Sequence, residues 1–323
     1  MSIYDYLKSI AKADCLSYPD YIKAVLYHPE LGYYRKNKRR VGYSPHTDFY
    51  TSSSINHIFP RLVATAARNL LGDTDELQEY TFVEIGAEPE ESLLANVDHP
   101  FKEGLVFRVD DEINIPERAV VFSNELLDAQ PFFRLVYKDS FWRERAICLK
   151  EGSLEEIMLD EASPELRPFI EMLPKQAVEG YQLDIPYYAE TLFDKITQQA
   201  WNGLLMFFDY GLPWETLVNE TPQGTARTYH HHKQDSDLID NPGEKDITCH
   251  ICWDRLESIL HKNNFRKTRI HRQEGFFVHY ATKEIERIIT KNPMGFDPDK
   301  KSLQQLLHPS HMGAKFQVLT GMR

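Results

Sequence analysis

Carboxylate and carboxamide side chains close or follow four short apolar segments of the sequence, at residues 81–86, 105–110, 119–123 and 203–209. Segments dense in Val, Leu, Ile and Phe are typical of buried parallel strands. In an open sheet of such strands, ligands bind beyond the carboxyl ends. Taken singly, each acid can equally be a helix N-cap or a loop residue. Together they predict a binding site made by Glu84 and Gly86, Asp110 and Asp111, Asn124 and Glu125, and Asp209 and Tyr210.

The turn after the first segment, at residues 86–90, limits what this site can bind. A loop that lies against a nucleotide cofactor usually needs several glycines, because a Cβ would block close approach and a positive φ would be strained. Here Gly86 is followed by Glu88 and Glu90. The absence of a G-x-G-x-x-G pattern makes a nicotinamide-dependent oxidoreductase a remote alternative. Asp110 stands at about the distance from Gly86 at which a ribose-binding acid is expected.

The hydrophobic pattern predicts the elements that must hold these residues. Residues 2–72 are expected to be helical, because apolar residues recur at helical spacing in three stretches, and Gly72 is placed to end the third. From about residue 80, strands alternate with helices, which indicates a parallel sheet with helices on its faces. The remaining elements that we expect are an antiparallel pair at 132–137 and 142–149, helices at 164–173 and 189–201, a long polar segment after 211, a helix carrying Trp253, a strand at 266–280, a helix near 283–290 and a final strand at 315–319.

Size and charge restrict the class of protein. The chain has 323 residues, of which 42% are hydrophobic and 27% charged, as is ordinary for a globular protein with a substantial core. Its formal net charge of −12 argues against general nucleic-acid binding. No apolar run approaches the roughly 20 residues of a membrane helix, and the N-terminus does not resemble a signal peptide. We therefore expect a cytoplasmic protein without a membrane or nucleic-acid partner.

The cysteines and histidines raise a metal site as an alternative. Four cysteines in a chain of this length do not make a disulfide framework. Cys249 and Cys252 form a C-x-x-C pair, and three histidines lie at 230–232, so zinc or redox chemistry has to be weighed. A structural zinc site usually requires a second pair at similar spacing, whereas Cys15 and Cys148 are isolated in the sequence. We expect no metal.

Five short motifs carry a family resemblance that covers nearly the whole chain. The motifs are Leu26-Tyr27-His28-Pro29-Glu30-Leu31-Gly32-Tyr33-Tyr34, Asp48-Phe49-Tyr50-Thr51-Ser52, Asn124-Glu125-Leu126-Leu127-Asp128-Ala129, Asp209-Tyr210-Gly211, and Pro242-Gly243-Glu244-Lys245-Asp246-Ile247-Thr248 with His250. Together, and in this order, they resemble the MidA family of S-adenosylmethionine-dependent methyltransferases, which includes a mitochondrial complex I assembly factor that symmetrically dimethylates a protein arginine.

The resemblance implies a fold, a cofactor and a substrate class. The fold is a class I methyltransferase-like (Rossmann-like) α/β domain, with a mostly parallel sheet and helices on both faces. We expect a helical N-terminal section at 1–75 and the α/β domain at 76–323, with an antiparallel and helical insertion at about 130–200. The implied cofactor is S-adenosylmethionine, and the implied partner is a protein substrate methylated on an arginine side chain.

Roles for individual residues follow from the motifs. Glu125 and Asp128 are three residues apart and would share a helix face. Two carboxylates there could orient a guanidinium by bidentate hydrogen bonds and offset its charge. For Asp48 and Thr51, a side-chain bond that stabilises the loop is an equally good interpretation. The predicted residues are Glu125, Asp128, Asp48 and Tyr210 for catalysis, Glu84, Gly86, Asp110, Asn124 and Asp209 for the cofactor, and Thr51 and His250 for the substrate.

Two functions remain open because the cofactor loop departs from the family pattern. Glu88 and Glu90 stand where that pattern has glycines, and their side chains would crowd the methionine end of the cofactor and repel its carboxylate. The stretch between Gly86 and Asn124 is also short, so the first helix and second strand are expected to be trimmed. We favour an active methyltransferase. The alternative is a catalytically inactive assembly or interaction factor that no longer binds S-adenosylmethionine.

Overall fold

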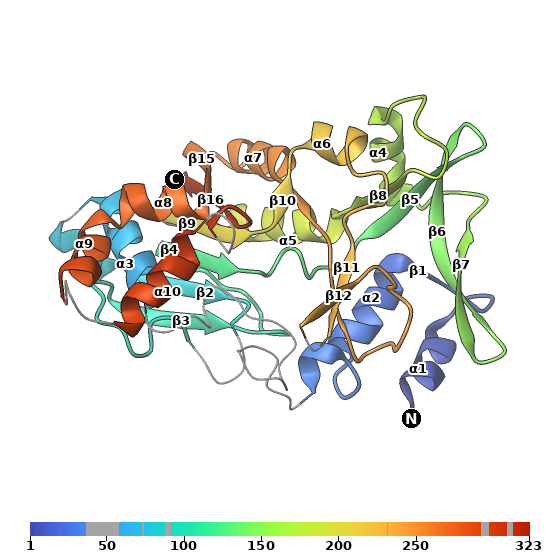
Figure 1. Ribbon diagram of the computed structural model, residues 1–323, viewed down its shortest axis with the longest axis horizontal. Coiled ribbons are helices and arrows are strands. Elements are labelled where there is room, and N and C mark those ends of the chain that lie inside the picture. Colours follow the sequence, from blue (N-terminus) through green and yellow to red (C-terminus); the bar gives the residue numbers. More distant parts are fainter. Residues whose placement is uncertain (37–57, 73, 88–91, 231, 292–296, 309–312) are drawn as a thin grey trace. The chain divides into compact units, whose positions relative to one another are not determined.

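The chain folds into two compact units, each built from three separate segments (Figure 1). The computed structural model describes residues 1–36, 58–72, 74–87, 92–230, 232–291, 297–308 and 313–323. Unit 1 comprises Met1–Phe49, Leu127–Thr191 and Leu212–Asp254, and unit 2 comprises Tyr50–Leu126, Leu192–Gly211 and Arg255–Arg323.

A six-stranded mixed sheet forms the centre of unit 2. β3, β2, β4 and β9 run parallel, and β16 and β15 complete the sheet in antiparallel orientation. The four parallel strands match the four predicted segments closely, so the predicted α/β fold is confirmed. In spatial order the strands are β15 (Arg266–Arg272), β16 (Gln317–Met322), β9 (Asn202–Asp209), β4 (Arg118–Asn124), β2 (Thr81–Ile85) and β3 (Glu103–Phe107).

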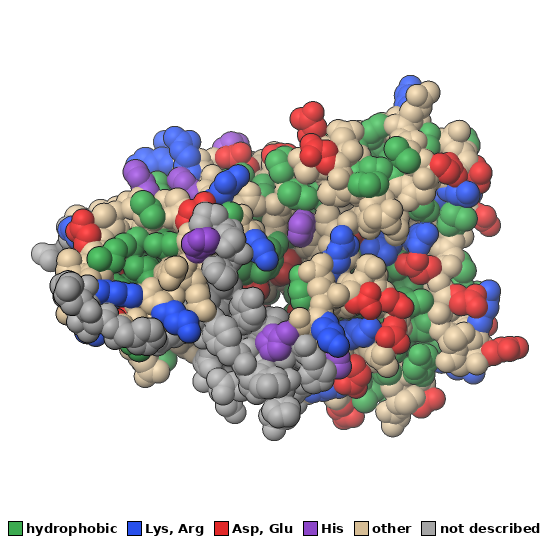
Figure 2. Space-filling view, viewed as in Figure 1, with side chains coloured by type: hydrophobic (Ala, Val, Ile, Leu, Met, Phe, Trp, Pro, Cys, Tyr) green, Lys and Arg blue, Asp and Glu red, His purple; other side chains and the backbone are tan. Residues whose placement is uncertain are grey.

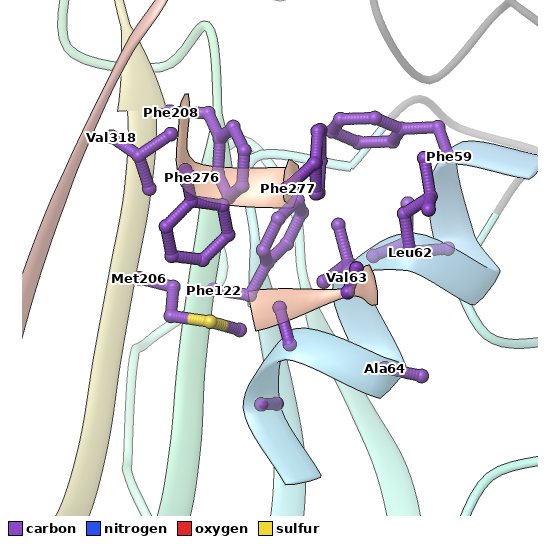
Figure 3. Close-up of a cluster of buried hydrophobic side chains, with 14 of the residues drawn as sticks. Phe59, Leu62, Val63, Ala64, Phe122, Met206, Phe208, Phe276, Phe277 and Val318 are labelled. Carbon is purple, nitrogen blue, oxygen red and sulfur yellow. The ribbon is translucent and has the colours of Figure 1, made fainter. Parts of the chain in front are cut away.

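Helices cover both faces of this sheet. Successive side chains of a strand point to opposite faces, so an apolar strand has apolar side chains to bury on each face. On one face, Phe208 of β9 packs edge-on against Phe59, with ring centroids 5.5 Å apart, and stacks on Phe277 at 5.7 Å (Figure 3). On the other face, the neighbouring Phe207 contacts Phe193 at 5.3 Å. The elements involved are α3 (Ile58–Leu71), α8 (Gln273–Tyr280), α9 (Thr282–Lys291) and α10 (Pro298–Leu307) around the first face, and α5 (Tyr187–Thr197), whose residue Phe193 lies on the second.

Unit 1 contains a five-stranded antiparallel sheet in which β1, β6, β5 and β8 are adjacent and β7 pairs with β6. The predicted hairpin is confirmed as β5 (Phe133–Lys138) and β6 (Phe141–Lys150). Its turn residues Asp139 and Ser140 have φ values of 53° and 67°, as a tight two-residue hairpin turn requires. The other strands of the sheet are β1 (Cys15–Ser17), β7 (Ser153–Met158) and β8 (Gln182–Ile185).

The rest of unit 1 is made of short elements. A small antiparallel sheet orders β12, β11 and β13, within the segment predicted to be a long polar stretch. The bounds are α1 (Ile3–Ile10), α2 (Tyr18–Tyr27), α4 (Arg167–Met172), α6 (Trp214–Asn219), β11 (Arg227–His230), β12 (Lys233–Asp235), β13 (Asp246–Thr248) and β14 (Ile251–Cys252), with 3-10 turns at Tyr33–Arg35 and Pro164–Leu166. β10 (Gly211–Leu212) lies at a boundary between the units, α7 (Trp253–Lys262) belongs to unit 2 from Arg255 onward, and a further 3-10 turn, Asp75–Glu79, also belongs to unit 2.

A disulfide corrects the expectation that Cys15 and Cys148 are isolated. The two residues lie directly opposite each other in the antiparallel pair β1–β6, with Cα atoms 4.1 Å apart, and are bonded. Opposed residues of neighbouring strands bring their Cβ atoms within about 5.5 Å, so strand pairing alone brings these thiols together. Their separation of 133 residues hides this proximity in the sequence.

Two further expectations differ from the structure. The predicted strand at 266–280 is wrong in its second half, because β15 ends at Arg272 and α8 follows it. In α8, Phe276 and Tyr280 are four residues apart and lie on one helix face, with ring centroids 5.2 Å apart. The division into units also does not follow the predicted boundary at residue 75, because α1 and α2 belong to unit 1 whereas α3 belongs to unit 2.

None of the helices in the described part of the chain is both long enough and apolar enough to cross a membrane.

Candidate functional site

The end of β2 brings the backbone of Gly86 into a tight position. Gly86 has a φ of +87°, and its amide donates a hydrogen bond to the carbonyl oxygen of Phe107 at 2.8 Å. An added Cβ would lie 2.9 Å from Leu126 Cδ1. The position therefore favours glycine both by conformation and by space.

Glu84 holds the segment that follows this turn. Its Oε2 accepts a hydrogen bond from the amide of Leu93 at 2.7 Å. Residues 93–96 form a turn rather than a regular helix, which agrees with the expected trimming, although β3 is a regular strand. A carboxylate at the start of a helical turn satisfies an amide that has no partner within the turn. One oxygen of Glu84 therefore has a structural role.

Asn124 and Glu125 form a polar pair at the end of β4. Asn124 Nδ2 donates to Glu125 Oε1 at 3.0 Å, which orients the carboxamide. Among the residues that the structure describes, Asn124 Oδ1 and Ser123 Oγ are buried and have no hydrogen-bond partner. A buried acceptor left in this way costs free energy unless a ligand or water satisfies it. Ser123 is a site residue that the sequence did not single out, because a serine inside an apolar strand has no distinctive spacing.

The backbone of Glu125 is held in an unusual conformation. Its φ is +52°, a region that residues with a Cβ rarely adopt, and its amide donates to the carbonyl oxygen of Phe208 at 3.0 Å. Strained residues of this kind cluster at functional sites. The conformation also makes one prediction wrong: Glu125 and Asp128 do not share a helix face, because no helix begins at Glu125.

Acidic residues also mark the ends of β9 and β3. Asp209 is buried, and its Oδ1 accepts from the amide of Tyr210 at 2.7 Å, while the Tyr210 ring packs on Phe316 with centroids 4.1 Å apart. Asp110 has a φ of +72° in the turn after β3, where Asp111 Oδ2 accepts from the amide of Arg108 at 2.7 Å. Asp209 and Asp110 therefore lie at the ends of β9 and β3, where the sequence predicted them.

Strand register brings these ends to one edge of the unit 2 sheet. Ile85 lies opposite both Phe107 of β3 and Ser123 of β4, and Asn124 lies opposite Phe208 of β9. Because the four strands are parallel and adjacent, the predicted cofactor residues share this edge. Carboxylates only accept hydrogen bonds when ionised, so the edge is rich in acceptors and suited to a ligand with a cationic group.

In unit 1, three of the five motifs meet. Tyr27 Oη donates to the carbonyl oxygen of Ala129 at 2.9 Å, and Tyr34 Oη donates to Asp246 Oδ1 at 2.7 Å. The carbonyl oxygen of Asp128 accepts from the amide of Cys249 at 2.9 Å. Burial, with a smaller effect of the nearby aspartates, raises the pKa of Tyr27 and of Tyr34, so both hydroxyls remain protonated donors.

His250 lies beside this meeting point in the sequence and is largely buried. Burial, with a contribution from the charge of Arg227, lowers the pKa of His250, so the ring is neutral near pH 7. In the described part of the chain its Nδ1 is buried without a hydrogen-bond partner. A neutral ring with an unused nitrogen can exchange a hydrogen bond or a proton with a ligand.

The remaining predicted site residues have different outcomes. Asp48, Thr51, Glu88 and Glu90 lie outside the described residues. Cys249 and Cys252 are buried, and no group of three His, Cys, Asp or Glu residues in the described ranges could hold a metal ion.

A family model described as “Putative S-adenosyl-L-methionine-dependent methyltransferase” matches residues 63–271. The chain belongs to this family. The methyltransferase family match covers β2, β3, β4 and β9, whose carboxyl ends carry the candidate residues.

Solved structures agree with this family in fold. A protein from Burkholderia thailandensis bound to S-adenosylhomocysteine superposes with a TM-score of 0.85 at 21% identity, over 99% of this chain and 91% of that one. A native structure of an uncharacterized protein of the same superfamily from the same organism gives a TM-score of 0.80 at 21% identity, with the same coverage of both chains. A comparison with curated proteins gave no match.

Proposed function

We propose that this chain is an active methyltransferase that uses S-adenosylmethionine to methylate an arginine side chain of a protein. The observation that carries the proposal is the shared edge of β3, β2, β4 and β9, where Gly86, Asn124 and Glu125 lie in a chain that belongs to a methyltransferase family. The solved relative bound to S-adenosylhomocysteine supports the choice of cofactor. The arginine substrate rests on the resemblance of the five motifs to the MidA family.

The residues at this edge fit the cofactor. Gly86 gives the loop after β2 a φ of +87° and lets it pass close to Leu126, and this turn would hold the backbone of the loop near the cofactor. Asn124 Oδ1 is a buried acceptor, without a partner among the described residues, that would bind the cofactor's ammonium group. Glu84 and Asp110 would position the loops on either side, and Asp209 would add negative charge near the cationic centre. When bound, S-adenosylmethionine supplies a methyl group on a sulfonium.

The substrate side would use carboxylates and a neutral histidine. Methyl transfer is an in-line displacement, so alignment of the acceptor nitrogen would supply much of the catalysis. Glu125 and Asp128 would each accept hydrogen bonds from a guanidinium and offset its charge. His250, neutral and largely buried in unit 1, is the proposed uncharged hydrogen-bonding group on the substrate side. Tyr210, Asp48 and Thr51 complete the proposed set.

Calorimetric titration with S-adenosylmethionine tests the proposal. We expect a Kd in the range of roughly 1 μM to 1 mM, and weaker binding by Asn124→Ala because its buried acceptor is lost. Asn69→Ala is the matched control, since Asn69 bonds to the carbonyl oxygen of Tyr280 in the helical layer. Changing both Glu88 and Glu90 to glycine should strengthen binding if their charges oppose the cofactor. No heat at about 1 mM ligand from a folded protein would support the inactive assembly factor instead.

The substrate class needs a separate measurement. A protein that binds the cofactor should transfer a labelled methyl group to arginine in a protein extract, and acid hydrolysis of the labelled product should release methylated arginine. Label recovered on lysine or histidine, or released as methanol from a methyl ester, would leave the methyltransferase in place but overturn the arginine assignment.

A further inference from the structure

Unit 1 contains a cavity of about 960 Å³ that is lined from its five-stranded and three-stranded sheets and by none of the strand-end residues described above. Residues of β5, β6, β7, β8, β11 and β12, and of the loop after β12, line it. Figure 2 shows basic and acidic side chains gathered next to each other on the face that carries these elements in Figure 1. The volume is near the upper end of the roughly 300–1,000 Å³ of ligand pockets.

Most charges around the cavity neutralise one another. Arg134 Nε donates to Asp184 Oδ1 at 2.9 Å, and both side chains are almost fully buried. Arg145 forms an ion pair with Glu156, which also accepts from the hydroxyl of Tyr18. The first pair is buried, whereas the side chains of Arg145 and Glu156 are 25% and 27% exposed, and together the pairs leave little net charge for a ligand to meet.

Arg227 is a cation that this lining does not neutralise. Its guanidinium donates to the carbonyl oxygens of Ala226 at 2.6 Å and Gly224 at 3.4 Å, and in the described chain it has no carboxylate within 4.0 Å. Arginine has five N–H donors, so several remain for a ligand. The two carbonyl contacts fix the direction of the group, which lowers the entropy cost of binding a carboxylate.

Asp235 and Asp237 are acids that the lining does not neutralise either. Asp235 Oδ1 accepts from the amide of Ser236 at 2.6 Å, and Asp237 Oδ1 accepts from the amides of Ile239 and Asp240, both at 3.1 Å. Neither carboxylate has a cationic partner in the described part of the chain. Each therefore has an oriented second oxygen, Asp235 at the end of β12 and Asp237 on the loop that follows, and both residues line the cavity.

Amide side chains line the wall between these two charged positions. Gln182 and Gln223 are neighbours in a parallel bridge, and Gln234 lies on β12 next to Tyr229. A glutamine side chain can donate and accept at once, as a peptide group does. A wall of glutamines is therefore suited to hydrogen-bond a peptide backbone.

We propose that this cavity binds a short peptide segment that carries one acidic and one basic side chain. The carboxylate of the peptide contacts Arg227, its cationic group contacts Asp235 and Asp237, and its backbone contacts the glutamines. This site concerns unit 1 alone, so it stands whether or not the chain transfers methyl groups.

Three capped tripeptides test the charge pattern by calorimetry at low salt. The probes are acetyl-Glu-Gly-Lys-amide, acetyl-Glu-Gly-Gln-amide and acetyl-Gln-Gly-Lys-amide. We expect the first to bind about tenfold more tightly than either of the others, because each loses one charged contact. Equal Kd values for all three, or no binding of the first at about 5 mM, would overturn the proposal.

Two variants of the cavity test which residue binds the acidic side chain of the peptide and which binds the basic one. Arg227→Gln should abolish the preference for Glu over Gln in the peptide and keep the preference for Lys. Asp237→Asn keeps the Oδ1 acceptor for the loop amides. It should abolish the preference for Lys over Gln in the peptide and keep the preference for Glu. Arg167→Gln is the matched control, because Arg167 is an exposed arginine of the same unit outside the cavity. Thermal unfolding of each variant separates lost binding from lost folding, and parallel loss of both preferences in the control would contradict the assignment.

Discussion

Gly86 is a single residue on which the cofactor edge depends. Replacing it with alanine should destabilise the protein by about 1–2 kcal/mol, because a residue with a Cβ is strained at a φ of +87°. The added Cβ would also press on Leu126 Cδ1, the mobile end of a side chain, which adds little. The free energy of unfolding by denaturant measures the effect.

Gly104 provides the matched control for Gly86. It lies in β3 of the same sheet and has no positive φ, and a Cβ added there would have no neighbouring heavy atom within 4 Å. Gly104→Ala should therefore be neutral or stabilising by up to about 1 kcal/mol. If the two alanine variants had equal stabilities, the backbone at Gly86 would not be constrained as described.

At the scale of residues, the sequence predicted the placement of polar residues at strand ends better than their backbone conformation. Asn124, Glu125 and Asp209 were found because polar residues directly follow apolar strands, and the structure places them at the same sheet edge. The φ of +52° at Glu125 could not be predicted, because glutamate does not favour that region and the tertiary bond of its amide to Phe208 is not visible in the sequence. The helix expected from Glu125 to Asp128 was wrong for that reason.

At the scale of elements, a buried carboxylate ties β6 to the segment before α4. Glu144 accepts hydrogen bonds from the amide of Ser163 at 2.6 Å and from its hydroxyl at 3.0 Å. Burial raises the pKa of Glu144 above its ordinary value. The folded state therefore retains this proton more strongly than the unfolded chain does, and the contribution of Glu144 to stability falls as the pH rises from the ordinary pKa of 4.5 through the raised one.

Glu144→Gln should remove this pH dependence. Relative to the wild type, the variant should gain stability as the pH rises above 4.5, because glutamine keeps an acceptor for Ser163 and cannot ionise. Glu179→Gln should lose stability relative to the wild type as the pH rises. Hydrogen bonds from Lys138 and from the amide of Asp139 lower the pKa of Glu179, so its contribution to stability is present above the ordinary pKa. Unfolding free energies from pH 4 to pH 8 would contradict the account if both variants had the same slope.

Elements with strong local patterns were predictable and those without were not. β2, β4 and β9 are continuous apolar runs because both faces of a parallel sheet are buried. β7 reads Ser-Leu-Glu-Glu-Ile-Met and is mostly exposed, so its pairing with β6 has no signature in its own residues. The start of α8 was missed because β15 runs into it without an intervening loop.

At the scale of the whole molecule, the chain passes between the two units five times. The sequence could not predict this division, because it is defined by contacts between distant segments, such as the pairing of Cys15 with Cys148. The cavity of unit 1 was invisible for the same reason: Arg134, Gln182 and Arg227 line it from separate segments of the chain. Strand order and register, rather than local spacing, bring such residues together.

This division predicts that residues 76–323 cannot fold without residues 1–75. The deletion removes α3, whose buried residues Phe59, Leu62 and Val63 pack in the core of unit 2 (Figure 3), and α2, whose buried residues Tyr21 and Ile22 belong to the core of unit 1. Each fully buried side chain of this size contributes about 1.5–3 kcal/mol, so these five alone contribute roughly 8–15 kcal/mol, which is comparable with the roughly 5–15 kcal/mol by which a protein is stable.

The truncated chain should therefore lack a cooperative unfolding transition and bind a dye for exposed apolar surface. A chain of residues 12–323 is the control, since it loses α1, in which Leu7 is the buried residue, and keeps α2, α3 and the disulfide. This control should unfold cooperatively with a modest loss of stability. Cooperative unfolding of residues 76–323 would mean that the α/β domain expected at 76–323 folds without the helical N-terminal section.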